Sequence, residues 1–240
     1  MNGIILAGGF AKRLMPISEF IPKPLLPIDG RPLLDIIIDK IKEIDTEKIV
    51  ISINKRFEKE FNFYLKCRND ENLKILVEPT MREEEKFGAV KGILYAMENS
   101  GDNDYLVVAG DNYFDFILKP FYEFAIKNNK ITIVGYDIEN IELSKNYGVF
   151  SLENNKIKNF VEKPEKPFSS IVSTGIYYFP KDSVDLIKKY LMESENKDQI
   201  GKLIQWLINK TDVYAVVLKG KWVDIGNLDI YRELYNSFLP

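Results

Sequence analysis

The N-terminal stretch of this chain constrains both its fold and its site. An apolar run from Ile4 to Ala7 predicts a short buried strand, which ends at the glycine pair Gly8–Gly9. A glycine turn lets backbone N–H groups approach a ligand with no side chain in the way. Arg13 follows, and Lys23 stands between two prolines that stiffen its loop. A strand, a glycine turn and two cations in this order predict a phosphate-binding site.

Two common phosphate-binding motifs are excluded at this turn. The P-loop requires Gly-x-x-x-x-Gly-Lys-Ser/Thr, which occurs nowhere in the sequence. The dinucleotide-binding fingerprint requires Gly-x-Gly-x-x-Gly, whereas here Gly8 and Gly9 are followed by Phe10 and Ala11. A glycine pair after a strand is a weak signal alone, so the interpretation depends on the Pro-Lys-Pro-Leu segment at residues 22–25.

The front half of the chain alternates between short apolar runs and helical patterns. We expect helices after the turn at Asp29–Pro32, over 57–66, and from Gly88 to about 98. The alternation predicts an α/β fold with a doubly wound, mostly parallel mixed sheet. The strands expected in this half cover residues 4–7, 48–53, 73–77 and 105–109.

The second half has more strands and fewer helices, and no repeat or linker separates it from the first. We therefore expect a single domain over residues 1–240. Ligands of such sheets bind beyond the carboxyl ends of the strands, where Gly8–Gly9, Asp111 and the loops near Glu162 and Asp224 can converge. Expected strands cover 131–136, 148–152, 157–161, 171–179, 213–218 and 222–226, and expected helices cover 182–191, 203–209 and a last segment to about 238.

The composition excludes several kinds of site. The chain has no histidine, which excludes a Ser-His-Asp triad, a histidine general base and histidine-bound zinc. Its one cysteine, Cys67, excludes an internal disulfide, and we expect this residue to pack in or beside a helix. The net charge of −3 and the isoelectric point of about 5.3 argue against a nucleic-acid partner.

The sequence also gives no indication of a membrane partner. No stretch approaches the roughly 20 apolar residues of a membrane-spanning helix. The N-terminus lacks a basic region and runs directly into Gly8–Gly9, which argues against a signal peptide. We therefore expect a cytoplasmic location.

The N-terminal motifs resemble those of a known family. Leu6-Ala-Gly-Gly-x-x-x-Arg13-Leu-x-Pro16, followed by Pro22-Lys-Pro-Leu-Leu-Pro-Ile28, is similar to the signature of the sugar-1-phosphate nucleotidyltransferases. The resemblance is strongest to the glucose-1-phosphate thymidylyltransferases and uridylyltransferases, and it covers essentially the whole chain. It implies a Rossmann-like fold with a nucleotide-binding front half and a β-rich, sugar-binding back half. The implied substrates are a nucleoside triphosphate and a sugar 1-phosphate.

The resemblance implies roles for residues of the front half. Arg13, Lys23 and Asp111 match the family's catalytic positions, where Arg13 would hold the β- and γ-phosphates and Lys23 would face the α-phosphate. The residues implied to bind the nucleotide are Leu6, Ala7, Gly8, Gly9, Glu78 and Gly88.

A metal site is expected from two aspartates. Asp111 ends an apolar strand, and carboxylate oxygens are the ligands that Mg²⁺ prefers. Asp224, in Trp222-Val-Asp-Ile-Gly226, resembles the family's second metal ligand. Together they would hold one Mg²⁺ that bridges the phosphates.

The sugar phosphate is expected to bind in the back half. Phe160-Val-Glu-Lys-Pro164 resembles the family's Glu-Lys-Pro motif, in which Glu162 would accept hydrogen bonds from sugar hydroxyls and Lys163 would bind the phosphate. Gly148 would leave room for the sugar ring, and Thr174 would contact it.

The chain departs from the family's pattern at three places. Ala11-Lys12 replaces the usual Gly-Thr, and the family's Leu-Gly-Thr-Ala-Gly-like segment near the base is present only as Phe87-Gly88-Ala89-Val90-Lys91, where Gly88 matches. Glu78 stands near a position where thymidylyltransferases present a glutamine to the base. An ionised carboxylate only accepts hydrogen bonds, so it suits uracil, thymine or guanine better than cytosine.

We therefore expect nucleotidyl transfer from dTTP or UTP to a hexose 1-phosphate, with glucose 1-phosphate favoured. A mannose-1-phosphate guanylyltransferase and a non-catalytic regulatory homologue that binds NDP-sugars stay open as alternatives. The retained Glu162–Lys163 pair argues for a sugar phosphate rather than phosphocholine. The sequence leaves the existence of a homo-oligomer open.

Overall fold

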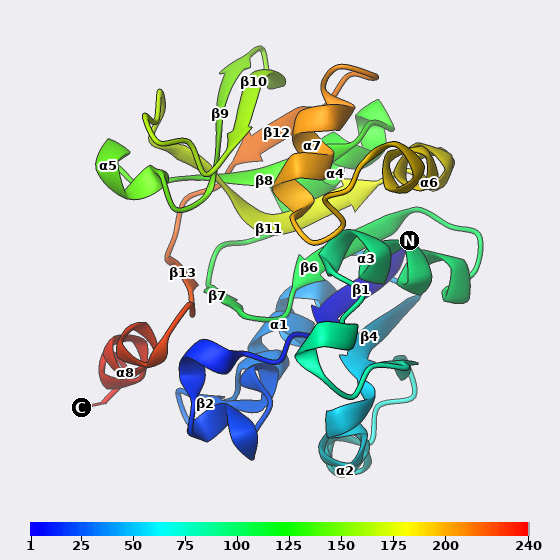
Figure 1. The fold of residues 1–240 in the computed structure, drawn as a ribbon, viewed down its shortest axis with the longest axis vertical. Helices are drawn as coiled ribbons and strands as arrows, with labels where there is room; N and C mark the ends of the chain where they lie inside the picture. The colour runs from blue at the N-terminus through cyan, green and yellow to red at the C-terminus, as the bar shows by residue number, and fades with distance from the viewer. Residues whose placement is uncertain (240) are drawn as a thin grey trace.

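The computed structural model of the protein, which describes residues 1–239, contains one large sheet (Figure 1). This sheet has nine strands in the order β5-β4-β1-β6-β11-β8-β12-β10-β9, and two smaller sheets pair β13 with β7 and β2 with β3. The strands are β1 (Asn2–Ala7), β2 (Pro27–Ile28), β3 (Arg31–Pro32), β4 (Lys48–Asn54), β5 (Leu73–Glu78), β6 (Tyr105–Ala109), β7 (Asn112–Phe114), β8 (Thr132–Asp137), β9 (Gly148–Glu153), β10 (Lys156–Glu162), β11 (Ile171–Phe179), β12 (Tyr214–Val217) and β13 (Trp222–Asp224).

Helices cover both faces of the front part of the sheet, as the sequence predicts. Neighbouring residues of β1 point to opposite faces, so that Ile5 belongs to the buried cluster of α1 and Ile4 to the buried cluster of α3. Both residues are fully buried. The helices are α1 (Leu33–Lys42), α2 (Glu58–Arg68), α3 (Ala89–Asn99), α4 (Lys119–Asn128), α5 (Ile141–Ser144), α6 (Val184–Glu193), α7 (Ile200–Leu207) and α8 (Leu228–Asn236).

The front four strands, β5, β4, β1 and β6, are parallel, which confirms the predicted doubly wound arrangement there. Their carboxyl ends therefore lie at one edge of the sheet. The strand order places β4 on one side of β1 and β6 on the other. This reversal of strand order opens a crevice beyond Ala7 and Ala109, where open α/β sheets bind their ligands.

The back half is mixed, so a mostly parallel sheet is the wrong description of it. β11 runs antiparallel to β6 and β8, and β10 runs antiparallel to β9 and β12. β9 also pairs with β11 at Val149 and Val172, which closes β11, β8, β12, β10 and β9 into a small ring. A two-residue turn explains one antiparallel pair, because Asn154 and Asn155 both have the positive φ of a tight hairpin.

Three local features differ from the sequence-based expectations. Helix α4 was not indicated by the pattern, although Phe121 and Ala125 form its buried stripe. Helix α7 begins at Ile200, three residues before the expected start. Cys67 lies on α2 as expected but is exposed, so the expectation that it packs was wrong.

The last helix of the chain, α8, packs against an N-terminal segment, the β2 strand. Figure 1 shows α8 beside β2, and the hydroxyl of Tyr231 donates a hydrogen bond to the carbonyl of Pro27 at 3.1 Å. The strand before it, β13, pairs with β7, which brings Asp224 opposite Asn112. No helix within residues 1–239 combines the length and the apolar character that crossing a membrane requires.

Candidate active site

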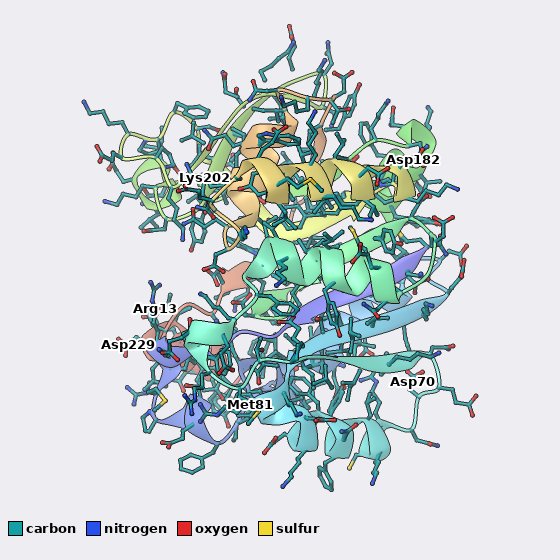
Figure 2. The ribbon with its side chains drawn as sticks, turned by 45° about the vertical axis from the view of Figure 1, so that its right-hand side comes forward. Arg13, Asp70, Met81, Asp182, Lys202 and Asp229 are labelled. Atoms are coloured by element: carbon teal, nitrogen blue, oxygen red, sulfur yellow. The ribbon has the colours of Figure 1, made fainter. Side chains whose placement is uncertain are left out.

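A cavity of about 650 Å³ lies at the carboxyl ends of β1 and β6 and is lined from both halves of the molecule. In Figure 2, Arg13 from the front half and Lys202 from the back half lie on the same side of the molecule. All residues that the sequence analysis assigned to the site line this cavity, namely Leu6, Ala7, Gly8, Gly9, Arg13, Lys23, Glu78, Gly88, Asp111, Gly148, Glu162, Lys163, Thr174 and Asp224. Their roles remain proposals.

The loop after β1 brings its backbone close to other groups. A Cβ on Gly8 would lie 2.9 Å from the nearer carboxylate oxygen of Glu78, so a side chain at this position would displace Glu78. Ala11 adopts a left-handed conformation, with φ 48° and ψ 41°, that a glycine would adopt more easily. Residues 12–14 then form a 3-10 turn in which Arg13 is exposed to solvent. Arg13 is therefore accessible to a ligand.

Lys23 is held by a short 3-10 turn, Lys23–Leu25, whose first residue follows Pro22 in an extended conformation. The residue is only 9% exposed, which is unusual for a lysine. Its Nζ donates a hydrogen bond to Oδ2 of Asp111 at 2.9 Å. A buried ammonium group needs such a partner, and here the partner comes from the end of the neighbouring strand β6.

The carboxylates of Asp111 and Asp224 influence one another. The backbone N–H of Ile225 donates to the carbonyl of Asp111 at 3.2 Å, which brings the two segments together. Burial and the negative charge of Asp111 raise the pKa of Asp224 to about 6. Lys23, Lys163 and Arg13 oppose this shift, so the site already combines two carboxylates with three cations.

This arrangement fits a magnesium ion. Two carboxylates whose charges repel each other are stabilised by a cation between them, and their oxygens are hard donors. Within residues 1–239 no three acidic, cysteine or histidine side chains gather into a metal-binding group. Mg²⁺ commonly takes one or two carboxylates and completes its shell with water and substrate phosphates, so two aspartates suffice.

Glu78 lies at the end of the cavity beside α3. Its carboxylate is 6% exposed and accepts a hydrogen bond from the hydroxyl of Ser52 at 2.8 Å. Burial raises its pKa above the ordinary value for glutamate. A Cβ on Gly92 would lie 3.3 Å from Oε1, so Gly8 and Gly92 leave this carboxylate its space.

The opposite end of the cavity contains the residues expected to bind the sugar phosphate. Lys163 adopts a left-handed backbone, with φ 49°, and its N–H donates to the carbonyl of Tyr147 at 2.9 Å. Burial raises the pKa of Glu162, against the charges of Lys163 and Lys202. The hydroxyl of Thr174 is 3.0 Å from the carbonyl of Val134, to which it donates. The hydroxyl hydrogen of Thr174 is therefore already used within the protein and is less available to a sugar.

The sequence analysis missed a segment that joins the two ends of the cavity. The N–H groups of Ala89 and Val90, in the first turn of α3, donate to the carbonyls of Asp198 and Lys197 at 3.3 and 3.1 Å. The side chain of Lys86 also lies 2.8 Å from Oδ2 of Asp198. No local motif marks this segment, because its partners lie more than a hundred residues away in the chain.

Comparisons with known proteins give matches over nearly the whole chain. Residues 2–239 match the family model described as nucleotidyl transferase. The chain is 31% identical over 227 residues to a bifunctional protein GlmU of Methanocaldococcus jannaschii, covering 94% of this chain and 51% of the relative. It is 25% identical over 263 residues to a UTP–glucose-1-phosphate uridylyltransferase of Synechocystis, covering 100% of this chain and 66% of that protein.

The solved structures show the same fold. A UDP-glucose pyrophosphorylase complexed with UDP-glucose superposes with a TM-score of 0.83 at 23% identity, covering 99% of this chain and 97% of that chain. The chain spans about half to two thirds of the length of the curated relatives that it matches.

Proposed function

The chain belongs to the nucleotidyl transferase family, and on this premise we propose that it transfers a nucleotidyl group from a nucleoside triphosphate to a hexose 1-phosphate. The products are an NDP-sugar and pyrophosphate, with dTTP or UTP and glucose 1-phosphate as the favoured substrates. The observation that carries the proposal is the convergence of Lys23, Asp111 and Asp224 at the centre of one cavity. Glu78 lies at one end of that cavity and Glu162 with Lys163 at the other.

The reaction requires alignment and charge neutralisation more than it requires a base. An oxygen of the sugar phosphate forms a new bond to the α-phosphorus, while the bond from that phosphorus to the β-phosphate oxygen breaks and pyrophosphate leaves. The attacking oxygen is already an anion, so the lack of histidine is no obstacle. The protein's task is to hold two polyanions together in line.

The cations of the front half perform this task. Lys23, fixed by Asp111, faces the α-phosphate and stabilises the charge that develops there. Arg13 is exposed at the phosphate loop, where its planar guanidinium can bind two oxygens of the departing pyrophosphate. A Mg²⁺ ion held by Asp111 and Asp224 would supply further neutralisation of the phosphate charge.

The two ends of the cavity select the substrates. Glu78, which accepts from Ser52 and is otherwise free of charged partners, accepts a hydrogen bond from the N–H edge of the base. At the other end, Lys163 binds the sugar phosphate and Glu162 accepts hydrogen bonds from sugar hydroxyls. The 650 Å³ of the cavity is of the size that small-molecule sites usually have.

Pyrophosphate release tests this function directly. The purified protein is incubated with Mg²⁺, with either glucose 1-phosphate or mannose 1-phosphate, and with each of dTTP, UTP, GTP, CTP and ATP in turn. Release with dTTP or UTP that depends on both the sugar phosphate and Mg²⁺ supports the proposal. Release only with GTP and mannose 1-phosphate would favour guanylyl transfer. Binding of finished NDP-sugars without any turnover would favour a regulatory homologue.

A further inference from the structure

The carboxylate of Glu162 lies close to two glycines, Gly148 and Gly201. A Cβ on Gly201 would lie 1.7 Å from Oε2 of Glu162 and 2.5 Å from its carboxyl carbon. On the other side, a Cβ on Gly148 would lie 3.0 Å from the same oxygen. The carboxylate therefore occupies the volume that a side chain at residue 201 would fill.

A side chain at each of the two glycines would meet different groups. A Cβ on Gly148 would also come within 2.5 Å of the ring of Phe160, which is buried and stacked on Phe150. At Gly201, by contrast, the three nearest atoms all belong to Glu162. The absence of a side chain at Gly201 is thus explained by the space that Glu162 needs.

Gly201 is otherwise an unfavourable choice at its position. It is the second residue of α7 and has no positive φ, so alanine could adopt the same backbone conformation. Glycine within a helix is destabilising by about 1 kcal/mol relative to alanine. Of all residues except proline, glycine has the lowest helix propensity, and it occurs here at the position of α7 that Glu162 approaches.

Among residues 1–239, no side chain donates a hydrogen bond that shifts the pKa of the Glu162 carboxylate. Its pKa is raised by burial and lowered only by the charges of Lys163 and Lys202. Both Glu162 and Gly201 line the cavity. The carboxylate is therefore an acceptor at the cavity wall, and Gly148, the other glycine near it, lines the same cavity.

We propose that Gly201 is a positioning residue for sugar recognition, because it leaves its side-chain volume to Glu162 and so fixes where that carboxylate meets the sugar. The inference rests on the proposed function, since it takes the hydroxyl groups of a hexose 1-phosphate as the partners of Glu162. A side chain at residue 201 would push the carboxylate into the space of the sugar ring. The nucleotide end of the cavity would not change.

The test combines Gly201→Ala with Glu162→Asp. Gly201→Ala alone is expected to raise the KM for the sugar phosphate about tenfold or more, with the KM for the nucleotide within about twofold. Aspartate is one methylene shorter, so Glu162→Asp in the Gly201→Ala background should lower the sugar-phosphate KM again. A structural defect alone would not be repaired by a second substitution of this kind.

Asn209→Ala, at an exposed position two residues after the end of α7, is the control and is expected to leave both KM values unchanged. An unchanged sugar-phosphate KM in Gly201→Ala, or a double variant no better than Gly201→Ala, would overturn the inference.

A crystal structure of Gly201→Ala separates this inference from the proposed function. If the wild-type protein releases no pyrophosphate with any substrate pair, the proposed function fails. The position of the carboxylate still tests the geometry, because the inference requires that it shift into the cavity in the variant. A carboxylate that stays in place, with the helix displaced instead, would contradict it.

Discussion

The ammonium group of Lys23 lies 2.9 Å from the carboxylate of Asp111, although the two residues are 88 positions apart in the sequence. Only 11% of the lysine side chain is exposed, whereas 42% of the aspartate side chain is exposed. The lysine is therefore fixed by its burial, and the aspartate keeps part of its surface open to a ligand. One pair thus places a cation and the carboxylate proposed to bind Mg²⁺ at the same point of the cavity.

Lys23→Ala is predicted to lower turnover by roughly a hundredfold or more, since it removes a charge that stabilises the transition state. The fold should persist, because alanine is tolerated in the short turn that holds this residue. Turnover and the circular dichroism spectrum are measured together. Lys59→Ala, which removes an exposed lysine of α2, is the matched control. Near-normal turnover in Lys23→Ala would remove this residue from the proposed mechanism.

Asp111→Asn is predicted to reduce turnover by a similar factor and also to weaken the dependence on Mg²⁺. The amide is a poorer ligand for a hard cation and does not pair with the charge of Lys23. A titration of activity with Mg²⁺ should show a higher half-saturating concentration in this variant. Asp115→Asn serves as the control, because this exposed residue just after β7 accepts a hydrogen bond from the N–H of Lys221 and asparagine keeps that acceptor. Equal Mg²⁺ titrations for Asp111→Asn and the wild type would contradict the metal assignment.

The raised pKa of Asp224 predicts that, without Mg²⁺, the free energy of unfolding depends on pH. Its pKa is about 6 in the folded protein, because burial and Asp111 disfavour its charge, and near 3.8 without these effects. Between these values the folded state binds more protons than the unfolded state. The free energy of unfolding should therefore fall as the pH rises from about 4 to above 6, by roughly 1–3 kcal/mol.

The check is urea unfolding across this pH range in the presence of EDTA. Asp224→Asn does not titrate, so the difference between wild type and variant should change with pH in the direction given above. Asp229→Asn, at an exposed position on α8, should follow the wild-type curve. A constant difference between wild type and Asp224→Asn would show that this carboxyl group does not change its pKa on folding.

The sequence was sufficient for the features that depend on local pattern. Apolar runs identified β1, β4, β5 and β6. Those of β1, β4 and β6 are nearly continuous because parallel strands inside the sheet are covered on both faces, whereas the edge strand β5 has an exposed lysine, Lys74. Gly8 and Asp111 follow strand ends, where such folds bind ligands, whereas the roles expected for Lys23 and Asp111 came from the resemblance of their motifs to the family's. Their meeting in one cavity follows from the parallel arrangement.

Features that depend on distant partners were not predictable in this way. The ring of β11, β8, β12, β10 and β9 closes where β9 pairs with β11 at Val149 and Val172, two positions that no local motif relates. The role proposed for Gly201 was not predictable from a motif, because it depends on the packing of Glu162 against this glycine. Helix α4 buries only Phe121 and Ala125, and its other apolar residues, Tyr122, Phe124 and Ile126, lie off this stripe and obscure the helical period.

Glu78→Gln is predicted to change the ranking of nucleotides. The amide can still accept from Ser52, so the fold should be retained, but it also donates hydrogen bonds. Because cytosine presents an acceptor where uracil presents an N–H, the ratio of kcat/KM for CTP to that for UTP should rise roughly fivefold or more. Glu71→Gln, which alters an exposed carboxylate, should leave the ratio unchanged. An unaltered ratio in Glu78→Gln would separate this residue from base recognition.

Ala11→Gly is predicted to stabilise the protein without loss of turnover. Ala11 has φ 48° and ψ 41°, a left-handed conformation that costs a residue with a Cβ roughly 1–2 kcal/mol. Glycine removes this penalty, while its greater freedom in the unfolded chain offsets part of the gain. The net increase in the free energy of unfolding should be up to about 1 kcal/mol.

The same substitution at Ala125 provides a control of opposite sign. Ala125 is fully buried in α4, where glycine is less favourable by about 1 kcal/mol and the methyl group's packing is lost as well. Urea unfolding should therefore shift the two variants in opposite directions from the wild type. Because the loop already adopts the backbone that glycine would adopt, turnover of Ala11→Gly should be at least that of the wild type. Destabilisation by Ala11→Gly would mean that the loop has another conformation in solution, and with it another position for Arg13.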